Sequence, residues 1–161
     1  IRIYPLAFIN GTPLADMYKA GEFSIITFEE AINRATLIYL SALRHGIKTV
    51  KMGLTDNEVI KDRIIGGYYH PAFGFLVKSQ AYYLAVTKKI KEGAFQGNVV
   101  IFLNNHDIPH LLGHKRCNIL RFHELGISIT WEVVDIPSGF FKLKSENKEA
   151  LGNVFDAPSV I

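Results

Sequence analysis

A short basic stretch, Gly113-His114-Lys115-Arg116, has the residue types best suited to bind an anion. Gly113 lets the backbone come close to a ligand because it has no side chain. A predicted helix starts directly behind the stretch at Cys117, and the free N–H groups at a helix start favour a negative charge. Lys115 and Arg116 add two positive charges beside those N–H groups. The stretch therefore predicts a phosphate-binding loop.

The elements predicted around this loop follow the order strand, helix, loop, helix, strand. They are the apolar strand 98–103, the short helices 108–112 and 117–125, and the alternating strand 127–134. This order resembles the KH nucleic-acid-binding motif, whose GxxG loop clamps a nucleotide backbone. Arg116 stands where that motif has its second glycine. The candidate nucleic-acid-binding residues are Gly113, His114, Lys115, Arg116 and Asn118. A helical hairpin turned by one glycine explains the same residues, and both interpretations stay open.

Three histidines, His106, His110 and His114, are spaced four residues apart, which on one continuous helix would align their imidazoles as metal ligands. Pro109 and Gly113 argue against such a helix, because proline breaks a helix interior and glycine often ends one. We therefore interpret the three as surface histidines near a phosphate loop and predict no metal site.

His70 precedes Pro71, which suits the start of a helix that we predict to run to about Glu92. A histidine at this position has a lowered pKa or donates to an anion, or else it caps or packs, and spacing does not decide between these roles. The chain contains no Ser-His-Asp elbow, Walker loop or GxGxxG fingerprint.

The composition is that of a folded protein, with 48% hydrophobic and 20% charged residues. No apolar stretch approaches the roughly 20 residues needed to span a bilayer, so we expect no membrane segment. Cys117 is the single cysteine, which excludes an internal disulfide and any cysteine-only metal or iron–sulfur site, and favours the cytoplasm. A net charge of +3 and a pI near 9.0 permit an anionic partner without requiring one.

The chain begins within an apolar run, and residues 1–9 predict a strand buried on both faces of a parallel sheet. Such an opening suggests a piece of a larger protein, in which residues 1–8 would have another strand beside them. We expect this segment to form a homodimer contact or to be displaced. Pro13 starts a short helix that Gly21 ends.

Thr27 and Glu30 form a predicted capping box that opens a long helix, which Gly46 ends. Residues 47–52 predict another strand and residues 53–63 a polar loop. Strands that alternate with helices indicate an α/β fold with parallel strands. Near the end of the chain we predict a turn at 137–139, a strand at 140–144, and a mixed tail after Ser145 with at most one weak helix.

Short motifs occur in a fixed order along the chain. They are Ile3-Tyr4-Pro5, Ile9-x-Gly11-Thr12-x-Leu14, Tyr18-x-x-Gly21-Glu22-Phe23, Glu29-Glu30-Ala31, Met52-Gly53-Leu54, Gly67-Tyr68-Tyr69-His70-Pro71-Ala72-Phe73 and Leu112-Gly113-His114-Lys115-Arg116-Cys117-Asn118-Ile119. The first four resemble a region of radical S-adenosylmethionine (SAM) enzymes related to the elongator catalytic subunit. The others resemble a bacterial branch labelled Fe-S oxidoreductase or coproporphyrinogen-oxidase-like. The resemblance covers about residues 1–134.

This resemblance implies an α/β (α+β) fold in two domains. Residues 1–92 would be the last strand–helix part of a partial TIM-type radical SAM barrel, and residues 93–161 a small KH-like β-α-α-β domain. Gly11 and Thr12 would lie at the end of a barrel strand that faces the active site, and together with His70 they are the candidates for lining a substrate or SAM pocket.

The resemblance also implies cofactors and partners. The full-length parent would carry a CxxxCxxC motif that holds a [4Fe-4S] cluster and uses it to cleave SAM. This chain lacks that motif, so we expect neither the cluster nor the primary SAM site within it. The expected partners are the N-terminal catalytic half of the parent and an RNA substrate, tRNA by the elongator relation.

We therefore interpret the chain as the C-terminal part of a radical SAM oxidoreductase, with an accessory domain that binds RNA and presents it to the catalytic half. The alternative is a structural or interaction module that closes the barrel or a dimer and has no ligand of its own, which the many aromatic residues and the weak basicity would suit. An independent small enzyme has the least support, because no nucleophile–base pair emerges.

Overall fold

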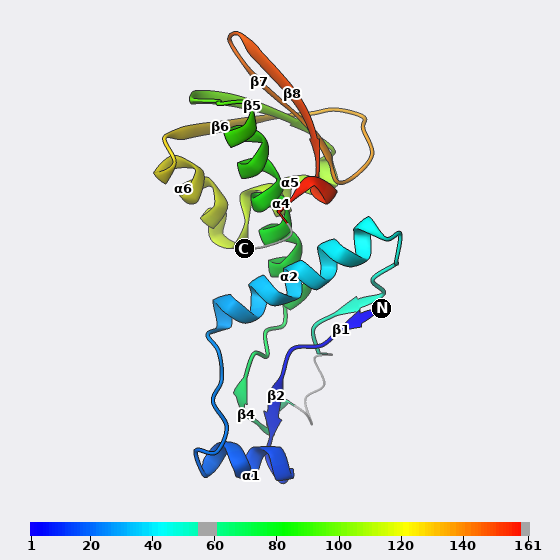
Figure 1. Cartoon of the computed structure of the whole chain (residues 1–161), viewed down its shortest axis with the longest axis vertical. Coiled ribbons are helices and arrows are strands. Elements are labelled where there is room, and N and C mark those ends of the chain that lie inside the picture. Colours follow the sequence, from blue (N-terminus) through cyan, green and yellow to red (C-terminus); the bar gives the residue numbers. More distant parts are fainter. Residues whose placement is uncertain (55–60, 159–161) are drawn as a thin grey trace. The chain divides into compact units, whose positions relative to one another are not determined.

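The computed structural model describes residues 1–54 and 61–158, so part of the loop predicted over residues 53–63 lies outside the described residues. Two compact units make up the chain, Ile1–Val77 and Lys78–Ile161, and each is described by itself (Figure 1). The division falls within α4 (Phe73–Glu92). This division describes spatial compactness, and the two domains expected over residues 1–92 and 93–161 stay a prediction.

The opening segment of the first unit forms two short strands, where the sequence predicted one. β1 (Arg2–Ile3) pairs in parallel with β3 (Lys51–Met52), and β2 (Ala7–Ile9) pairs antiparallel with β4 (Ile64–Gly67). Pro5 lies between β1 and β2, and proline has no N–H to donate to a ladder. The prediction of a single strand over residues 1–9 is therefore wrong, and so is its burial on both faces, since Arg2 is exposed.

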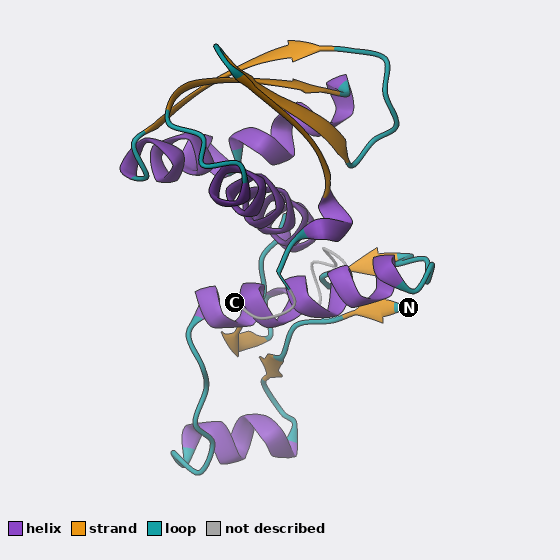
Figure 2. Ribbon diagram, turned by 45° about the horizontal axis from the view of Figure 1, so that its top comes forward, coloured by secondary structure: helices purple, strands orange, loops and turns teal. Residues whose placement is uncertain are grey.

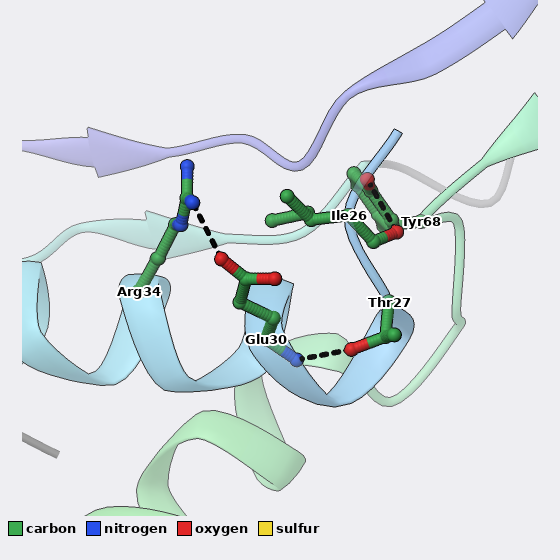
Figure 3. A network of polar contacts seen from close by, with 5 residues as sticks. All are labelled: Ile26, Thr27, Glu30, Arg34 and Tyr68. Carbon is green, nitrogen blue, oxygen red and sulfur yellow. Dashed lines mark hydrogen bonds and ion pairs between the residues drawn. The ribbon is translucent and has the colours of Figure 1, made fainter. Parts of the chain in front are cut away.

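The helices of the first unit begin at the residues that the sequence indicated. Thr12 caps α1 (Pro13–Lys19) by accepting a 3.3 Å bond from the Ala15 N–H. Thr27 caps α2 (Phe28–Arg44) by accepting a 3.1 Å bond from the Glu30 N–H (Figure 3). The Glu30 carboxylate pairs with Arg34 one turn further along instead of returning to the cap, so half of the predicted capping box forms.

The core of the first unit joins β1, α2 and the start of α4. Its buried members are Ile3, Ile32, Ala35, Phe73 and Val77. A second apolar cluster lies around β2, where the Phe8 ring stacks on Tyr18 with centroids 4.1 Å apart. Phe8 is fully buried, and burying a side chain of this size contributes roughly 1.5–3 kcal/mol. These contacts join β1 to α2 and the start of α4, and β2 to α1.

The second unit is built on a four-stranded sheet in the order β6-β5-β7-β8. Its strands are β5 (Gly97–Leu103), β6 (Ile127–Val133), β7 (Phe140–Ser145) and β8 (Lys148–Asn153). β5 and β6 run parallel, with Gly97 opposite Ile127 and Leu103 opposite Val133. β7 is antiparallel to both β5 and β8. Parallel neighbours need a crossover connection, and the segment that contains the basic loop supplies it.

Helices cover one face of this sheet, and Figures 1 and 2 both show α4, α5 (Ile108–Leu112) and α6 (Cys117–Glu124) on the same side. The other face carries no helix among the described residues. The core between helices and sheet contains Val99, Ile101, Leu103, Leu111, Phe122, Phe141 and Leu143, each 1% exposed or less. The predicted strand–helix–loop–helix–strand order and the mixed α/β class are confirmed.

β8 was not expected, because the tail after Ser145 was predicted to hold at most one weak helix. The segment Lys148–Asn153 contains a single large apolar residue, Leu151, so its sequence has little strand character. Its register with β7 comes from the antiparallel ladder, and the Lys148 ammonium adds bonds to the Gly93 and Ala94 carbonyls at 3.1 and 2.6 Å. Pairing with a neighbour decided the structure of this segment.

Candidate functional site

The basic loop of the second unit has an unusual backbone. Gly113, Lys115 and Arg116 have positive φ angles of 76°, 50° and 62°. For a residue with a side chain this region costs about 1–3 kcal/mol, so the surrounding structure must hold the loop. The Gly113 N–H donates to Pro109 and the Arg116 N–H donates to Gly113, both at 3.0 Å. The side chains of His114, Lys115 and Arg116 are exposed, so the loop presents its charges to solvent.

Gly113 is required by space as well as by φ. A Cβ atom at this position would lie 2.8 Å from the Cys117 sulfur and 3.1 Å from the Asn118 backbone nitrogen. The start of α6 thus packs directly on the glycine. The first turn of this helix has no side-chain cap, because Arg116 at the cap position carries donors and no acceptor. The close approach that the sequence predicted is therefore made by the chain's own helix.

Asn118 is buried, with 1% of its surface exposed. Its amide donates to the Ser79 carbonyl at 3.2 Å, the Ser79 hydroxyl at 3.0 Å and the His110 carbonyl at 3.1 Å. The structure therefore places this candidate binding residue in the interior of the unit, where it joins α4, α5 and α6. Its role in the site is to hold the loop.

Arg121 is a residue that the sequence analysis missed. Its guanidinium lies 3.4 Å from the centroid of the Tyr83 ring and donates to Gln80 at 2.8 Å and to Asn118 at 3.3 Å. A planar guanidinium can stack and donate at once, so this residue ties α6 to α4 behind the loop. Its spacing three residues after Asn118 was the available signal, since such residues share a helix face.

Trp131 on β6 is the second residue that the sequence analysis did not single out. The guanidinium carbon of Arg116 lies 5.8 Å from the centroid of its ring, within the range of a cation–π interaction. Sequence alternation had placed Trp131 on one side of a strand, and no local pattern connects it with Arg116, fifteen positions away. The parallel crossover brings them together.

The three spaced histidines lie on three different elements. His106 is in a 3-10 turn (Asn105–Asp107), His110 is in α5, and His114 is in a second 3-10 turn (His114–Arg116). The continuous helix that would align them does not form, as Pro109 and Gly113 indicated. Burial lowers the pKa of His110, the positive charge of Lys78 lowers it further, and Asp107 opposes both. Within residues 1–54 and 61–158 no cluster of three or more His, Cys, Asp or Glu side chains is placed to hold a metal ion.

Asp107 is at the cap position of α5, but its carboxylate makes no bond to that helix start and has other partners. It accepts from the Ser138 hydroxyl and from the Gly139 N–H, both at 2.7 Å. These two bonds fasten the turn between β6 and β7 to the start of α5. Asp107 itself is buried, with 4% of its surface exposed. Burial raises the pKa of the neighbouring Tyr82 hydroxyl, and the negative charge of Asp107 raises it further. Asp107 therefore has a structural role, which is to join the start of α5 to the turn that leads into β7.

The three pocket candidates of the first unit do not come together. Gly11 and Thr12 follow β2 at the end where Ile9 pairs with Ile64, and the Thr12 hydroxyl is used as a cap. His70 follows the opposite end of β4, where its Nδ1 accepts from the Ala72 N–H at 3.0 Å. A hollow of about 170 Å³ in this unit is lined by apolar residues that include Pro5, Tyr68 and Phe73, and by none of the three candidates.

Residues 1–83 match the Radical_SAM C-terminal domain. The chain belongs to this family. The match covers the first unit and the first residues of the second, so the basic loop lies beyond the matched residues of this Radical_SAM C-terminal domain protein. No curated protein and no solved structure matches the chain. No helix of the described residues has the length and apolarity needed to cross a membrane.

The radical SAM family implies a [4Fe-4S] cluster and SAM, and the residues present do not fit the cluster. Such clusters are held by several cysteine thiolates, and this sequence has Cys117 alone. Cys117 lies exposed at the start of α6, where its thiol donates to the Asn118 amide oxygen at 3.8 Å. We therefore derive no chemical step through a cluster held by these residues.

Proposed function

We propose that the second unit binds RNA through the loop Gly113-His114-Lys115-Arg116 and presents it to a radical SAM catalytic part that supplies the cluster and SAM. The observation that carries the proposal is the loop's backbone. Arg116 stands where a KH loop has its second glycine, and its φ of 62° is one that glycine adopts easily. The loop thus has a positive φ angle at both ends, Gly113 and Arg116. Lys115 and Arg116 add two positive charges to it.

The charges of the loop support an anionic ligand. His114, Lys115 and Arg116 are all exposed, and the uncapped start of α6 lies behind them. Asn118 and Arg121 hold this helix against α4, so the loop is positioned before any ligand arrives. Preorganised charges lose less free energy on binding than mobile ones. Phosphate contacts of this kind supply most of the non-specific affinity for nucleic acid.

The test is tRNA binding by the full chain at several salt concentrations. Lys115→Ala combined with Arg116→Gly removes both charges, and glycine suits the left-handed backbone at position 116. If both side chains contact phosphates, the slope of log K against log salt should fall by about 1.4 to 1.8. Glycine relieves the backbone strain at position 116 but removes the Arg116–Trp131 contact, so thermal unfolding of the double variant checks that the chain remains folded.

A matched control removes the same charge elsewhere in the second unit. Lys91→Ala combined with Lys144→Ala changes two exposed lysines on α4 and β7. This control should keep the slope of the parent chain. Equal losses for both double variants would mean that net charge alone attracts RNA, and salt-insensitive binding, or none at micromolar protein, would refute the proposal.

A second function is favoured by a different observation, an apolar groove on the open face of the sheet. The groove has a volume of about 530 Å³ and is lined by Phe102, Ile136, Phe140 and Leu151 among others. Leu151 is 77% exposed and Phe140 is 40% exposed. Such a face suits an interaction module that contacts the catalytic part or a second copy of the chain. A dimer through residues 1–8 is a separate proposal of the same class.

Oligomeric state separates these two modes of contact. Leu151→Lys places a charge in the groove, whereas Arg2→Ala changes the exposed residue of β1. A dimer that is lost only with Leu151→Lys identifies the groove as the contact. A chain that stays monomeric at every concentration, together with tRNA binding that depends on the loop, supports the RNA proposal over the interaction module.

A further inference from the structure

Arg116 and Trp131 form a cation–π pair at the side of the basic loop. The guanidinium carbon lies 5.8 Å from the centroid of the indole ring. The arrangement follows from the topology. β6 comes directly after α6 and runs back beside it, so the start of α6 lies near the C-terminal end of β6. The pair therefore puts an aromatic ring beside the three exposed side chains of the loop.

Trp131 lies where the covered face of β6 becomes exposed. Along that face Ile127 and Ile129 are 3% and 8% exposed, Trp131 is partly exposed, and Val133 is 57% exposed. β6 is also an outer strand, since it pairs with β5 and with no other described strand. Part of the Trp131 side chain is therefore open to solvent at the margin of the core, beside the strand edge and the Arg116 guanidinium.

We infer that this site takes a single-stranded segment of nucleic acid, with its phosphates on the loop and one unpaired base stacked on the Arg116–Trp131 pair. The inference rests on the proposed function and narrows its ligand to a single strand. Aromatic rings and arginine planes stack on any base, because every base has a π-face. In a duplex those faces are covered by neighbouring bases, so a helical ligand gains contacts from the loop alone.

Trp131 is the sole tryptophan of the sequence, so its fluorescence reports directly on this position. The experiment titrates the full chain with a short unstructured RNA, the same sequence as DNA, the corresponding duplex, and polyphosphate, under excitation that is selective for tryptophan. The single-stranded RNA should quench the emission on binding. The DNA arm shows whether the sugar matters, and polyphosphate should bind the loop without quenching.

Two variants separate stacking from a structural role of the tryptophan. Trp131→Leu keeps an apolar side chain and should weaken binding of a labelled single strand by about 5- to 150-fold, the range measured for the loss of one base–aromatic stack. Trp131→Phe keeps a π-face and should recover part of that affinity. Thermal unfolding of both variants checks that the sheet remains folded, and the phenylalanine variant carries the test if the leucine variant does not fold.

The outcomes distinguish this inference from the proposed function. Two results together support both the phosphate loop and the stacking site. Single strands quench the emission whereas polyphosphate does not, and the affinity decreases from the parent chain to Trp131→Phe to Trp131→Leu. Single-strand binding that leaves the emission unchanged and tolerates Trp131→Leu overturns the stacking site and leaves the phosphate loop in place. Equal affinity for duplex and single strand also overturns the stacking site. Absence of binding to any nucleic acid overturns both.

Discussion

The amide of Asn118 on α6 donates a 3.0 Å hydrogen bond to the hydroxyl of Ser79 on α4. Two further bonds from the same amide reach the Ser79 and His110 carbonyls, so one buried side chain connects three helices. Asn118 lies four residues after His114, the first exposed residue of the loop. The position of Asn118 therefore determines where the loop lies. The geometry of an exposed binding loop thus depends on a residue that no ligand reaches.

Asn118→Ala should therefore destabilise the chain. The change leaves the Ser79 hydroxyl and the His110 carbonyl without this donor, at a cost of about 1–3 kcal/mol in the free energy of unfolding. Urea titration followed by circular dichroism measures the loss. Asn105→Ala, at an exposed position, is the control and should change the free energy by less than about 0.5 kcal/mol. Similar values for the two variants would contradict the anchoring role.

Gly113→Ala should cost more than the same change at Gly126. The two glycines have nearly the same φ, 76° and 75°, so alanine pays a similar backbone penalty at both. At Gly126 an added Cβ meets nothing within 4 Å, whereas at Gly113 it lies 2.8 Å from the Cys117 sulfur. Overpacking of this kind adds about 1–3 kcal/mol. Thermal or urea unfolding compares the variants, and equal losses would show that α6 moves away without cost.

Asp107→Asn should destabilise the turn between β6 and β7. The two carboxylate oxygens accept one bond each from Ser138 and Gly139, and an amide offers a single acceptor oxygen. The loss of one charge-assisted bond in a buried position costs about 1.5–3 kcal/mol.

Urea unfolding of the parent chain and of Asp107→Asn measures this loss. Asp135→Asn is the control, since Asp135 is exposed. If Asp107→Asn unfolds like the parent chain, the hydrogen bonds to the turn contribute little to the folded state.

His110 should make the chain less stable in mild acid. Burial is the first cause that lowers its pKa in the folded state below the ordinary value of 6.5, and Lys78 is the second. Between the folded and unfolded pKa values the unfolded chain binds more protons, so the free energy of unfolding falls as the pH drops below about 6.5 and levels off below the folded pKa. His110→Asn should remove this contribution to the pH dependence.

The measurement compares urea unfolding of the parent and His110→Asn across that pH range. His123→Asn, at an exposed position on α6, should keep the steeper acid dependence of the parent chain. The Asn118 bond at this position goes to the His110 backbone carbonyl, so the substitution keeps it. An unchanged slope in His110→Asn would show that this histidine protonates equally in both states.

Local signals in the sequence predicted much of the fold. Thr12 and Thr27 mark helix starts, and the helices that follow them form because a capping hydroxyl and the first helical N–H groups are close in the chain. The apolar run from Asn98 to Leu103 forms β5, whose alternate side chains are buried. Pro5 is also a local signal, because proline has no N–H for a ladder, and it separates β1 from β2.

Contacts between residues far apart in the sequence could not be predicted from the sequence. Lys148–Asn153 forms a strand because β7 offers a ladder of partners, and the carboxylate of Asp107 bonds to a turn thirty-one positions away. The pair of Arg116 and Trp131 exists because a parallel crossover returns α6 along β6. No local sequence pattern predicts these contacts, because each depends on where the folded chain brings distant segments together.

The sequence by itself determined that a glycine-led basic loop joins two short helices between two strands, because residue type and spacing set turns, caps and charge. Only the tertiary structure decided which residues of that loop are available to a ligand. It buries Asn118 among three helices and brings Trp131 beside Arg116, because side-chain packing and the return path of the chain, rather than neighbours in sequence, determine burial and contact.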